Sequence, residues 1–284
     1  MPHHIRQLAV GAIQTHIINI GDVQEDLVRL LGATDADVAA HPALFAQPAR
    51  LPIQSIHLAA SGASILVDAG AYDYPPDSPL LIPGYTPPPD LLASLAAAGI
   101  DAQSITHVVI THAHGDHFNA LTEGEGEQAR PCFANARHYL GRGDWEKMQP
   151  ELADPASLQS RTLGLLHRRG QLELVDSPLE LTEGVTILPA PGESPGHQVV
   201  RVHSQGETLY CIGDLYHVSA EVEHPVWMPP WNDRAANGQS RAALNERFVA
   251  ENALLVASHI AEVGRMQKTR HGYIWANFDP FSSD

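Results

Sequence analysis

Short runs of β-branched and aliphatic residues recur along the chain, and each ends in Gly, Pro or a polar residue. Runs of this kind, bounded by Gly and Pro, indicate buried strands. Those that lead into side chains capable of chemistry lie at 64–67, 108–110, 185–188, 208–212 and 254–258. The pattern therefore predicts buried sheets whose strand ends carry polar groups.

Helical patterns alternate with these runs. Residues 90–98 place Leu91, Leu92 and Leu95 on one face, and Gly99 follows as a stop signal. We also predict helices over 155–168 and 240–253. Strands mixed with helices are typical of a layered α/β domain in which helices cover the sheets.

Two stretches show neither periodicity. Residues 73–89 are dense in proline and predict a loop that either forms the mouth of a site or makes a homodimer contact. Residues 221–239 also look irregular. We interpret neither stretch as a domain boundary. The prediction is one domain over 1–284, with a core at about 53–259, an N-terminal extension 1–52 and a C-terminal strand segment 260–284.

Composition narrows the class of protein. The chain has 284 residues, of which 44% are hydrophobic and 18% charged, as expected for a large globular domain. Its formal net charge is −16 with no basic block, which argues against a nucleic-acid partner. We find no signal-peptide pattern and no apolar stretch near eighteen residues, so we expect no membrane segment and, by default, a cytoplasmic location.

Residues 111–117 concentrate the candidate chemistry. Four metal-capable side chains follow the run 108–110 directly: His112, His114, Asp116 and His117. Imidazoles and carboxylates hold zinc or a related divalent ion in open, catalytic sites. His112 and His114 are two residues apart, so at a strand end both point to the same side. The spacing predicts a metal site and disfavours a purely structural role.

Three further strand ends carry His197, Asp214 and His259. Together with 111–117 they make a pattern that resembles the metallo-β-lactamase fold hydrolases in their dinuclear form, over most of the chain. The resemblance implies a four-layer αβ/βα sandwich. It also implies that one metal is held by His112, His114 and His197, a second by Asp116, His117 and His259, with Asp214 bridging the two and Asp68 supporting them from outside.

The resemblance implies two divalent metal ions as cofactors. Zinc is the first expectation, and manganese, iron and cobalt tolerate the same ligands. Two such ions activate a water molecule and polarise the bond under attack. Asp116 is then expected to pass a proton to the leaving group.

Residue 217 bears on the substrate. His217 lies three residues after Asp214, where lactonase-like members of the family often place a Tyr or His that hydrogen-bonds the substrate. Residues 213–217 look like those of N-acyl homoserine lactonases and methyl parathion hydrolase-like enzymes. The expected reaction is hydrolysis of a small lactone or other ester, with His217 contacting the substrate. The alternative is that His217 is a loop or helix-start residue.

An acyl or aryl group in the substrate requires apolar pocket walls. The candidate aromatic residues, each of which could equally belong to the core, are Phe118, Trp145, Tyr216, Trp227 and Trp231. Two other reactions fit the same ligands. One is hydrolysis of a phosphotriester, and the other is oxidation by a mono-iron sulfur dioxygenase.

Overall fold

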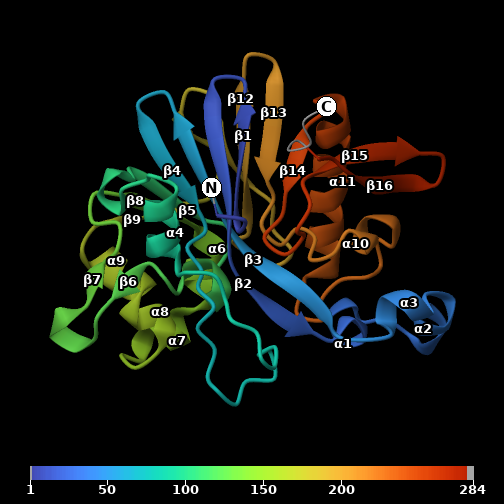
Figure 1. Ribbon diagram of the computed structural model, residues 1–284, viewed down its shortest axis with the longest axis horizontal. Helices are drawn as coiled ribbons and strands as arrows, with labels where there is room; N and C mark the ends of the chain where they lie inside the picture. The colour runs from blue at the N-terminus through green and yellow to red at the C-terminus, as the bar shows by residue number, and fades with distance from the viewer. Residues whose placement is uncertain (1, 280–284) are drawn as a thin grey trace.

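Two large sheets stacked face to face form the centre of the molecule, and helices cover their outer faces (Figure 1). The computed structural model describes residues 2–279 of the chain. Helix α4 packs outside the first sheet, and helix α11 packs outside the second. This order of layers confirms the predicted α/β sandwich.

The first sheet has seven strands in the order β1-β2-β3-β4-β5-β8-β9. Neighbours from β1 to β4 are antiparallel, and those from β4 to β9 are parallel. The segment 1–52, expected as an extension, supplies two of these strands. The bounds are β1 (Ile5–Val10), β2 (Ile13–Glu25), β3 (Ala49–Ala60), β4 (Ala63–Val67), β5 (His107–Ile110), β8 (Arg137–Gly141) and β9 (Leu172–Val175).

The second sheet has seven strands in chain order, from β10 to β16. The pair β13–β14 is parallel, and the other neighbours are antiparallel. The C-terminal segment forms a hairpin at the sheet edge, in line with the predicted strand character. The bounds are β10 (Leu179–Thr182), β11 (Val185–Pro189), β12 (Gln198–Ser204), β13 (Glu207–Cys211), β14 (Leu254–Val256), β15 (Gly264–Thr269) and β16 (Gly272–Asn277).

An apolar core fills the space between the two sheets. Ile56 and Val109 from the first sheet and Val200 and Leu209 from the second are all buried within it. The opposite faces of the sheets are covered by helices, so the central strands are buried on both sides. Burial on both faces explains why these strands read as continuous apolar runs. The paired sheets give a rigid base for the loops at their ends.

The longest helix begins earlier than the sequence pattern predicts. Helix α11 (Arg234–Ala250) starts six residues before the predicted position, so the interpretation of 221–239 as irregular was wrong for its last part. The Asp233 side chain accepts hydrogen bonds from the backbone N–H groups of Ala235 and Ala236, and such a cap fixes a helix start. A short helix, α10 (Ala220–Glu223), also lies in that stretch.

Of the other two predicted helices, one is confirmed and one is divided. Helix α4 (Leu91–Ala97) is confirmed, whereas the helix predicted over 155–168 is two short helices separated at Thr162, which has φ −104° and ψ −85°. These are α8 (Leu158–Arg161) and α9 (Leu163–Arg168). The remaining helices are α1 (Leu27–Leu31), α2 (Asp35–Ala40), α3 (Pro42–Phe45), α5 (Gly115–Phe118), α6 (Arg142–Lys147) and α7 (Gln149–Ala153), with 3-10 turns η1 (Ala102–Ser104) and η2 (Gly126–Gln128) and a small sheet β6 (Thr122–Glu123) and β7 (Arg130–Pro131).

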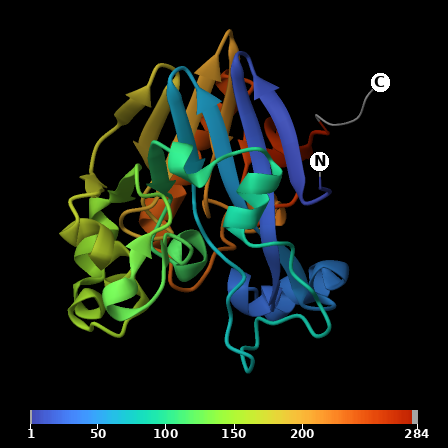
Figure 2. The same ribbon diagram turned by 60° about the vertical axis from the view of Figure 1, so that its left-hand side comes forward.

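The loops of both sheets gather at one end of the sandwich. Residues 73–89 form a loop without helix or strand, as predicted, and it hangs below the sheets in both views (Figures 1 and 2). The helices α1–α3 and α6–α9 lie at the same end (Figure 2). Among the described residues, no helix is long and apolar enough to cross a membrane.

Candidate metal centre

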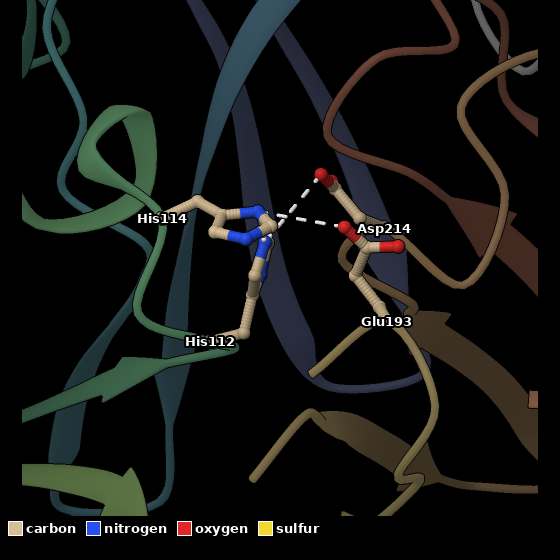
Figure 3. Close-up of side chains that lie close together, drawn as sticks. All are labelled: His112, His114, Glu193 and Asp214. Carbon is tan, nitrogen blue, oxygen red and sulfur yellow. Dashed lines mark hydrogen bonds and ion pairs between the residues drawn. The ribbon is translucent and has the colours of Figure 1, made fainter. Parts of the chain in front are cut away.

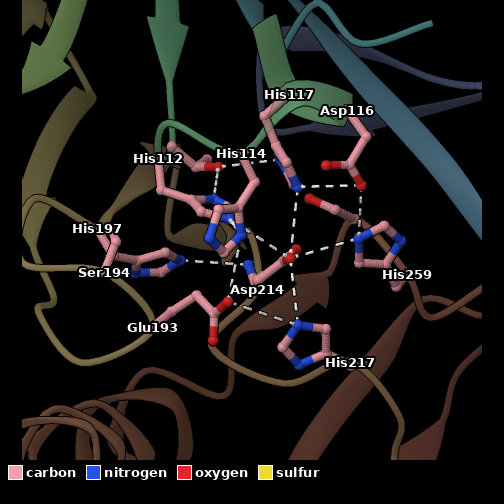
Figure 4. A network of polar contacts seen from close by, with 12 residues as sticks. His112, His114, Asp116, His117, Glu193, Ser194, His197, Asp214, His217 and His259 are labelled. Carbon is pink, nitrogen blue, oxygen red and sulfur yellow. Dashed lines mark hydrogen bonds and ion pairs between the residues drawn. The ribbon is translucent and has the colours of Figure 1, made fainter. Parts of the chain in front are cut away.

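The ends of strands from both sheets meet at one place. The segment after β5 brings His112 and His114, and helix α5 brings Asp116 and His117, while the loops after β11, β13 and β14 bring His197, Asp214 and His259 (Figure 4). The structure thus brings together the seven side chains that the sequence singles out. His112 Nε2 lies 2.8 Å from His114 Nδ1, so the two rings point to the same space, as their spacing predicts.

Asp116, His117 and His259 form one group that can hold a cation, which we call the second cluster. His259 Nε2 lies 3.3 Å from Asp116 Oδ2, and His117 Nε2 lies 3.7 Å from the same oxygen. Metal–ligand bonds of about 2.0–2.2 Å put neighbouring ligand atoms about 3.3–3.6 Å apart in a tetrahedral site. The second cluster has close to this spacing.

His112, His114, Glu193 and Asp214 form the other group, which we call the first cluster (Figure 3). His112 Nε2 lies 3.6 Å from Asp214 Oδ2, and His114 Nδ1 lies 3.4 Å from Glu193 Oε1. Glu193 was not predicted as a site residue. His197 lies beside the cluster, with its ring 5.4 Å from that of His112.

Asp214 joins the two clusters. Its Oδ2 atom is 3.4 Å from His117 Nε2 and 3.3 Å from His259 Nε2, in addition to its contact with His112 (Figure 4). Its other oxygen, Oδ1, is buried without a hydrogen-bond partner, and so is His117 Nε2. Buried polar atoms are rarely left without partners, so these two atoms are fitted to receive a ligand.

Outer hydrogen bonds orient the imidazole rings. Asp68 Oδ2 lies 2.9 Å from His117 Nδ1, and the Pro52 carbonyl lies 2.7 Å from His259 Nδ1. In each case Nδ1 has an outer partner and Nε2 faces the centre. Metal-binding histidines in proteins usually have this arrangement. Asp68 also accepts hydrogen bonds from the backbone and hydroxyl of Thr111. It has a φ of 59°, a strained value that persists where the surroundings fix the backbone.

The electrostatics of the site also fit a cation. Burial opposes charge on His259, but Asp214 and Asp116 outweigh it and raise the pKa of this imidazole to about 10. Burial likewise opposes the charge on Asp214, yet His259, His117 and other imidazoles lower the pKa of its carboxyl well below the usual range. The carboxylates thus favour a proton on His259, which a divalent ion would displace, whereas burial lowers the pKa of His112, His114 and His197 and favours the neutral form that binds metal. The donor set therefore suits a metal centre.

A second buried carboxylate, Asp144, ties two ligand-bearing loops together. Its Oδ2 accepts hydrogen bonds from the Ala113 backbone at 2.8 Å and from the Ser194 hydroxyl at 2.9 Å, and its Oδ1 accepts from the Gly196 backbone at 2.7 Å. These loops carry His112, His114, Glu193 and His197. Asp144 therefore sets the distance between the two sides of the first cluster.

His217 lies at the edge of both clusters. Its Nε2 is 3.3 Å from Asp214 Oδ2 and 3.8 Å from Glu193 Oε1. Glu221 Oε1 accepts a hydrogen bond of 2.6 Å from the His217 backbone N–H, and Glu221 in turn pairs with the buried Arg241. This buried network fixes the loop and presents the His217 ring toward the centre.

A cavity of ≈ 330 Å³ opens on the metal centre. Trp231, one of the candidate pocket residues, lines it, and the proline-rich loop contributes Asp73, Tyr74 and Leu80. Other apolar walls come from the N-terminal segment and α8, which were not predicted as pocket elements: Val23, Leu30, Leu51 and Leu158.

The other aromatic residues predicted for the pocket do not line this cavity. Phe118 and Trp227 are buried in the core around the first sheet, and Trp145 packs against it. Tyr216 is buried near α11, where its hydroxyl bonds Asn245. Those four assignments are corrected, because aromatic side chains near a site serve equally well to fill the core.

The cavity walls carry negative charge. Glu25 and Asp73 line the cavity together with Asp116 and Asp214, and no Lys or Arg is among the described residues that line it. Burial raises the pKa of the Glu25 carboxyl. Asp116 and Asp214 belong to the metal clusters, so Glu25 and Asp73 are the acidic lining residues that stand apart from them.

Two carboxylates of the site were not predicted from the sequence. Glu193 lies in the turn that leads to His197, and Asp144 follows β8, far from 111–117 in the chain. A signal for Glu193 was present, since a carboxylate within a turn that carries an expected ligand is a candidate ligand itself. No comparable signal marks Asp144.

Comparison with known proteins agrees with this geometry. Residues 51–277 match the model of the metallo-beta-lactamase superfamily. No curated protein sequence matches the chain.

Several solved structures are similar in fold. They include AidC, a dizinc quorum-quenching lactonase, at 20% identity over 97% of each chain with a TM-score of 0.76. The hydrolase AbOPH of the beta lactamase superfamily is 16% identical over 100% of each chain, with a TM-score of 0.80. A probable metal-dependent hydrolase from Staphylococcus aureus is 18% identical over 96% of this chain and 99% of its own, with a TM-score of 0.76. At these identities the likeness shows the fold.

Proposed function

The chain belongs to the metallo-β-lactamase superfamily, and on that premise we propose that it is a dinuclear metal hydrolase that opens a lactone or cleaves another carboxylic ester. The observation that carries the proposal is the shared carboxylate of Asp214. Its Oδ2 lies 3.3–3.6 Å from nitrogen atoms of His112, His117 and His259, so one oxygen faces both clusters. We take the ions to be zinc.

The metal ligands in this proposal are those that the resemblance implies: His112, His114, Asp116, His117, His197, Asp214 and His259. When bound, two divalent ions supply an activated water molecule and polarise the carbonyl group under attack. The chain's own residues hold and orient the reactants. The rigid sheet ends and the outer hydrogen bonds of Asp68 and Pro52 keep the ligands in place before substrate binds.

Asp116 and His217 are assigned the proton transfers and substrate contacts. Both line the cavity. Asp116 has a side chain 20% exposed, so its carboxylate can accept the proton that the attacking water loses and hand it to the leaving oxygen. His217 Nε2 faces the cavity side of Asp214 and can donate a hydrogen bond to the substrate oxygen on which charge develops.

The cavity favours a neutral ester. Its apolar side chains suit an acyl group, and Glu25 and Asp73, the lining carboxylates outside both clusters, disfavour anionic substrates. The similarity to a dizinc quorum-quenching lactonase supports a lactone as the first substrate class to test. We propose that the protein acts on a small molecule and does not act on nucleic acid, given its net charge of −16.

A substrate panel tests the proposal. Metal-loaded protein is assayed with acyl lactones of increasing chain length, an open-chain aryl ester and an aryl phosphotriester, and oxygen uptake is followed with a persulfide. Lactone or ester turnover that disappears with a chelator and returns with zinc is the expected result. Preference for the phosphotriester, or oxygen uptake with one iron per chain, would contradict the ester assignment.

A further inference from the structure

Glu193 is a buried carboxylate at the metal centre that the ligand pattern of the sequence does not include. Its exposed fraction is 1%, and it lies in the turn between Pro191 and His197. Its Oε2 atom has no hydrogen-bond partner. A carboxylate is costly to bury without compensation, so its position calls for a cation or donor nearby.

The distances place Glu193 at ligand spacing. Its Oε1 atom is 3.4 Å from His114 Nδ1, within the range expected for two ligands of one ion (Figure 3). The candidate ligand atoms of His112, His114, Glu193 and Asp214 all lie within 4.8 Å of one another. Figure 3 shows the Glu193 carboxylate facing the His114 ring across this space.

His197 differs from Glu193 in its surroundings. Its Nδ1 lies 3.0 Å from the Ala190 carbonyl, and its Nε2 accepts a hydrogen bond of 3.2 Å from the Asp214 backbone N–H. Both ring nitrogens therefore have backbone partners, whereas one Glu193 oxygen has none. Glu193 therefore offers this cluster one oxygen at ligand spacing, Oε1, and a second, Oε2, that no other group occupies.

Outer contacts hold the Glu193 carboxylate in position. The Trp231 indole N–H donates a hydrogen bond of 2.6 Å to Oε1. The turn itself is fixed by Asp144, through the Ser194 hydroxyl and the Gly196 backbone. A carboxylate ligand held by a further donor is the usual arrangement around metal ions in proteins.

We propose that Glu193 is an additional ligand of the metal ion held by His112 and His114. The assignment rests on the metal centre of the proposed function and is independent of the substrate. With the added carboxylate this position has one carboxylate of its own besides the shared Asp214, as the second cluster has in Asp116. Oxygen ligands suit manganese and iron, so Glu193 also raises the tolerance of this position for those ions.

Cobalt(II) is the probe that tests the assignment, because its visible absorption reports the number and type of its ligands. We compare the single variant His259→Ala with the double variant His259→Ala/Glu193→Gln. His259→Ala removes a second-cluster ligand, so that the cobalt spectrum reports the first cluster. The matched control is Glu25→Gln, the same change at a carboxylate that lines the cavity outside both clusters.

We expect Glu193→Gln to change the cobalt spectrum and to weaken binding at the first cluster by more than about 100-fold, since residues that only orient ligands cost about 10–100-fold. Glu25→Gln should change neither. A milder variant, Trp231→Phe, removes the N–H donor to Glu193 while keeping an aromatic ring, and should shift the spectrum while cobalt stays bound. Circular dichroism of each variant checks that the fold is retained.

An unchanged spectrum in Glu193→Gln would overturn the proposal. If affinity fell without a spectral change, Glu193 would orient His114 rather than bind metal, which also overturns it. A wild-type protein that binds two cobalt ions but opens no lactone contradicts the proposed function alone, because the spectra report Glu193 without any turnover.

Discussion

The two clusters of the metal centre differ in how they are held. In the second cluster, hydrogen bonds reach the imidazole rings directly, from Asp68 to His117 and from the Pro52 carbonyl to His259. In the first cluster the Thr111 hydroxyl lies 3.2 Å from His112 Nδ1, but the ring of His114, whose side chain is 37% exposed, contacts its cluster neighbours His112 and Glu193 and the indole of Trp231. Asp144 supports this cluster through the backbone of its loops, so the His114 ring has no buried carboxylate or carbonyl behind it comparable to Asp68 or Pro52 among the described contacts.

This difference shows how one fold can combine a metal position whose ligand rings are held in place with one whose ligand rings can move. Ligands whose rings are already oriented lose little freedom when an ion binds. We therefore expect the second cluster to bind its ion more tightly, and the first cluster to adjust as substrate enters. The shared carboxylate of Asp214 couples the two positions.

Removing the coupling residue should have the largest effect. Asp214→Ala deletes the oxygen that faces both clusters, so we expect both ions to be lost and turnover to fall by at least about 1,000-fold, the equivalent of several kcal/mol. Elemental analysis and a lactone assay measure the two quantities. Full activity with two ions retained would show that Asp214 does not bridge.

His217 separates substrate contact from metal binding. His217→Gln should lower kcat by about 100–1,000-fold, the cost of losing one donor to a developing negative charge, while both ions remain bound. His271→Gln, a change at an exposed histidine, is the control. Unaltered kcat in His217→Gln would make His217 a structural residue of its loop, as the alternative interpretation of the sequence holds.

A substitution of Asp68 tests whether its hydrogen bond to His117 strengthens metal binding at the second cluster. Asp68→Asn keeps the shape of the side chain but weakens its hold on His117, so affinity for one ion should fall by about 10–100-fold. Competition with a chromophoric chelator measures both affinities. Equal weakening of both positions would contradict the idea that the clusters are supported separately.

Asp144 should affect stability more than metal binding. Asp144→Asn weakens hydrogen bonds to Ala113, Ser194 and Gly196, and we expect the free energy of unfolding to fall by about 1–3 kcal/mol. Asp176→Asn is the matched control, because its ion pair with Arg142 lies on the surface and contributes about 1 kcal/mol at most. Denaturant titration of the metal-free proteins compares them.

The local pattern of the sequence predicted a layered α/β domain with polar strand ends, and the resemblance to metallo-β-lactamase fold hydrolases predicted the sandwich and the set of seven side chains. An apolar run that ends in His or Asp is visible in the chain, and strand ends of packed sheets meet at one edge. Glu193 was missed because its distance to His114 depends on how a turn folds back over the site. Asp144 was missed because its partners lie about 30 and 50 residues away in the chain.

Pocket residues were the least predictable part. Phe118 and Trp231 are both aromatic residues near expected site residues in the sequence. Phe118 is fully buried, whereas Trp231 lines the cavity. Burial of an aromatic residue is decided by tertiary packing, which a single sequence does not display. The acidic wall formed by Glu25 and Asp73 comes from segments distant from 111–117, for the same reason.

The most direct test of the two-metal centre is activity as a function of metal content. Metal-free protein is titrated with zinc while lactone hydrolysis and bound metal are measured on the same samples. The first equivalent should bind with little activity, and activity should rise with the second until two ions are bound per chain. Full hydrolytic activity at one ion per chain would contradict the dinuclear mechanism.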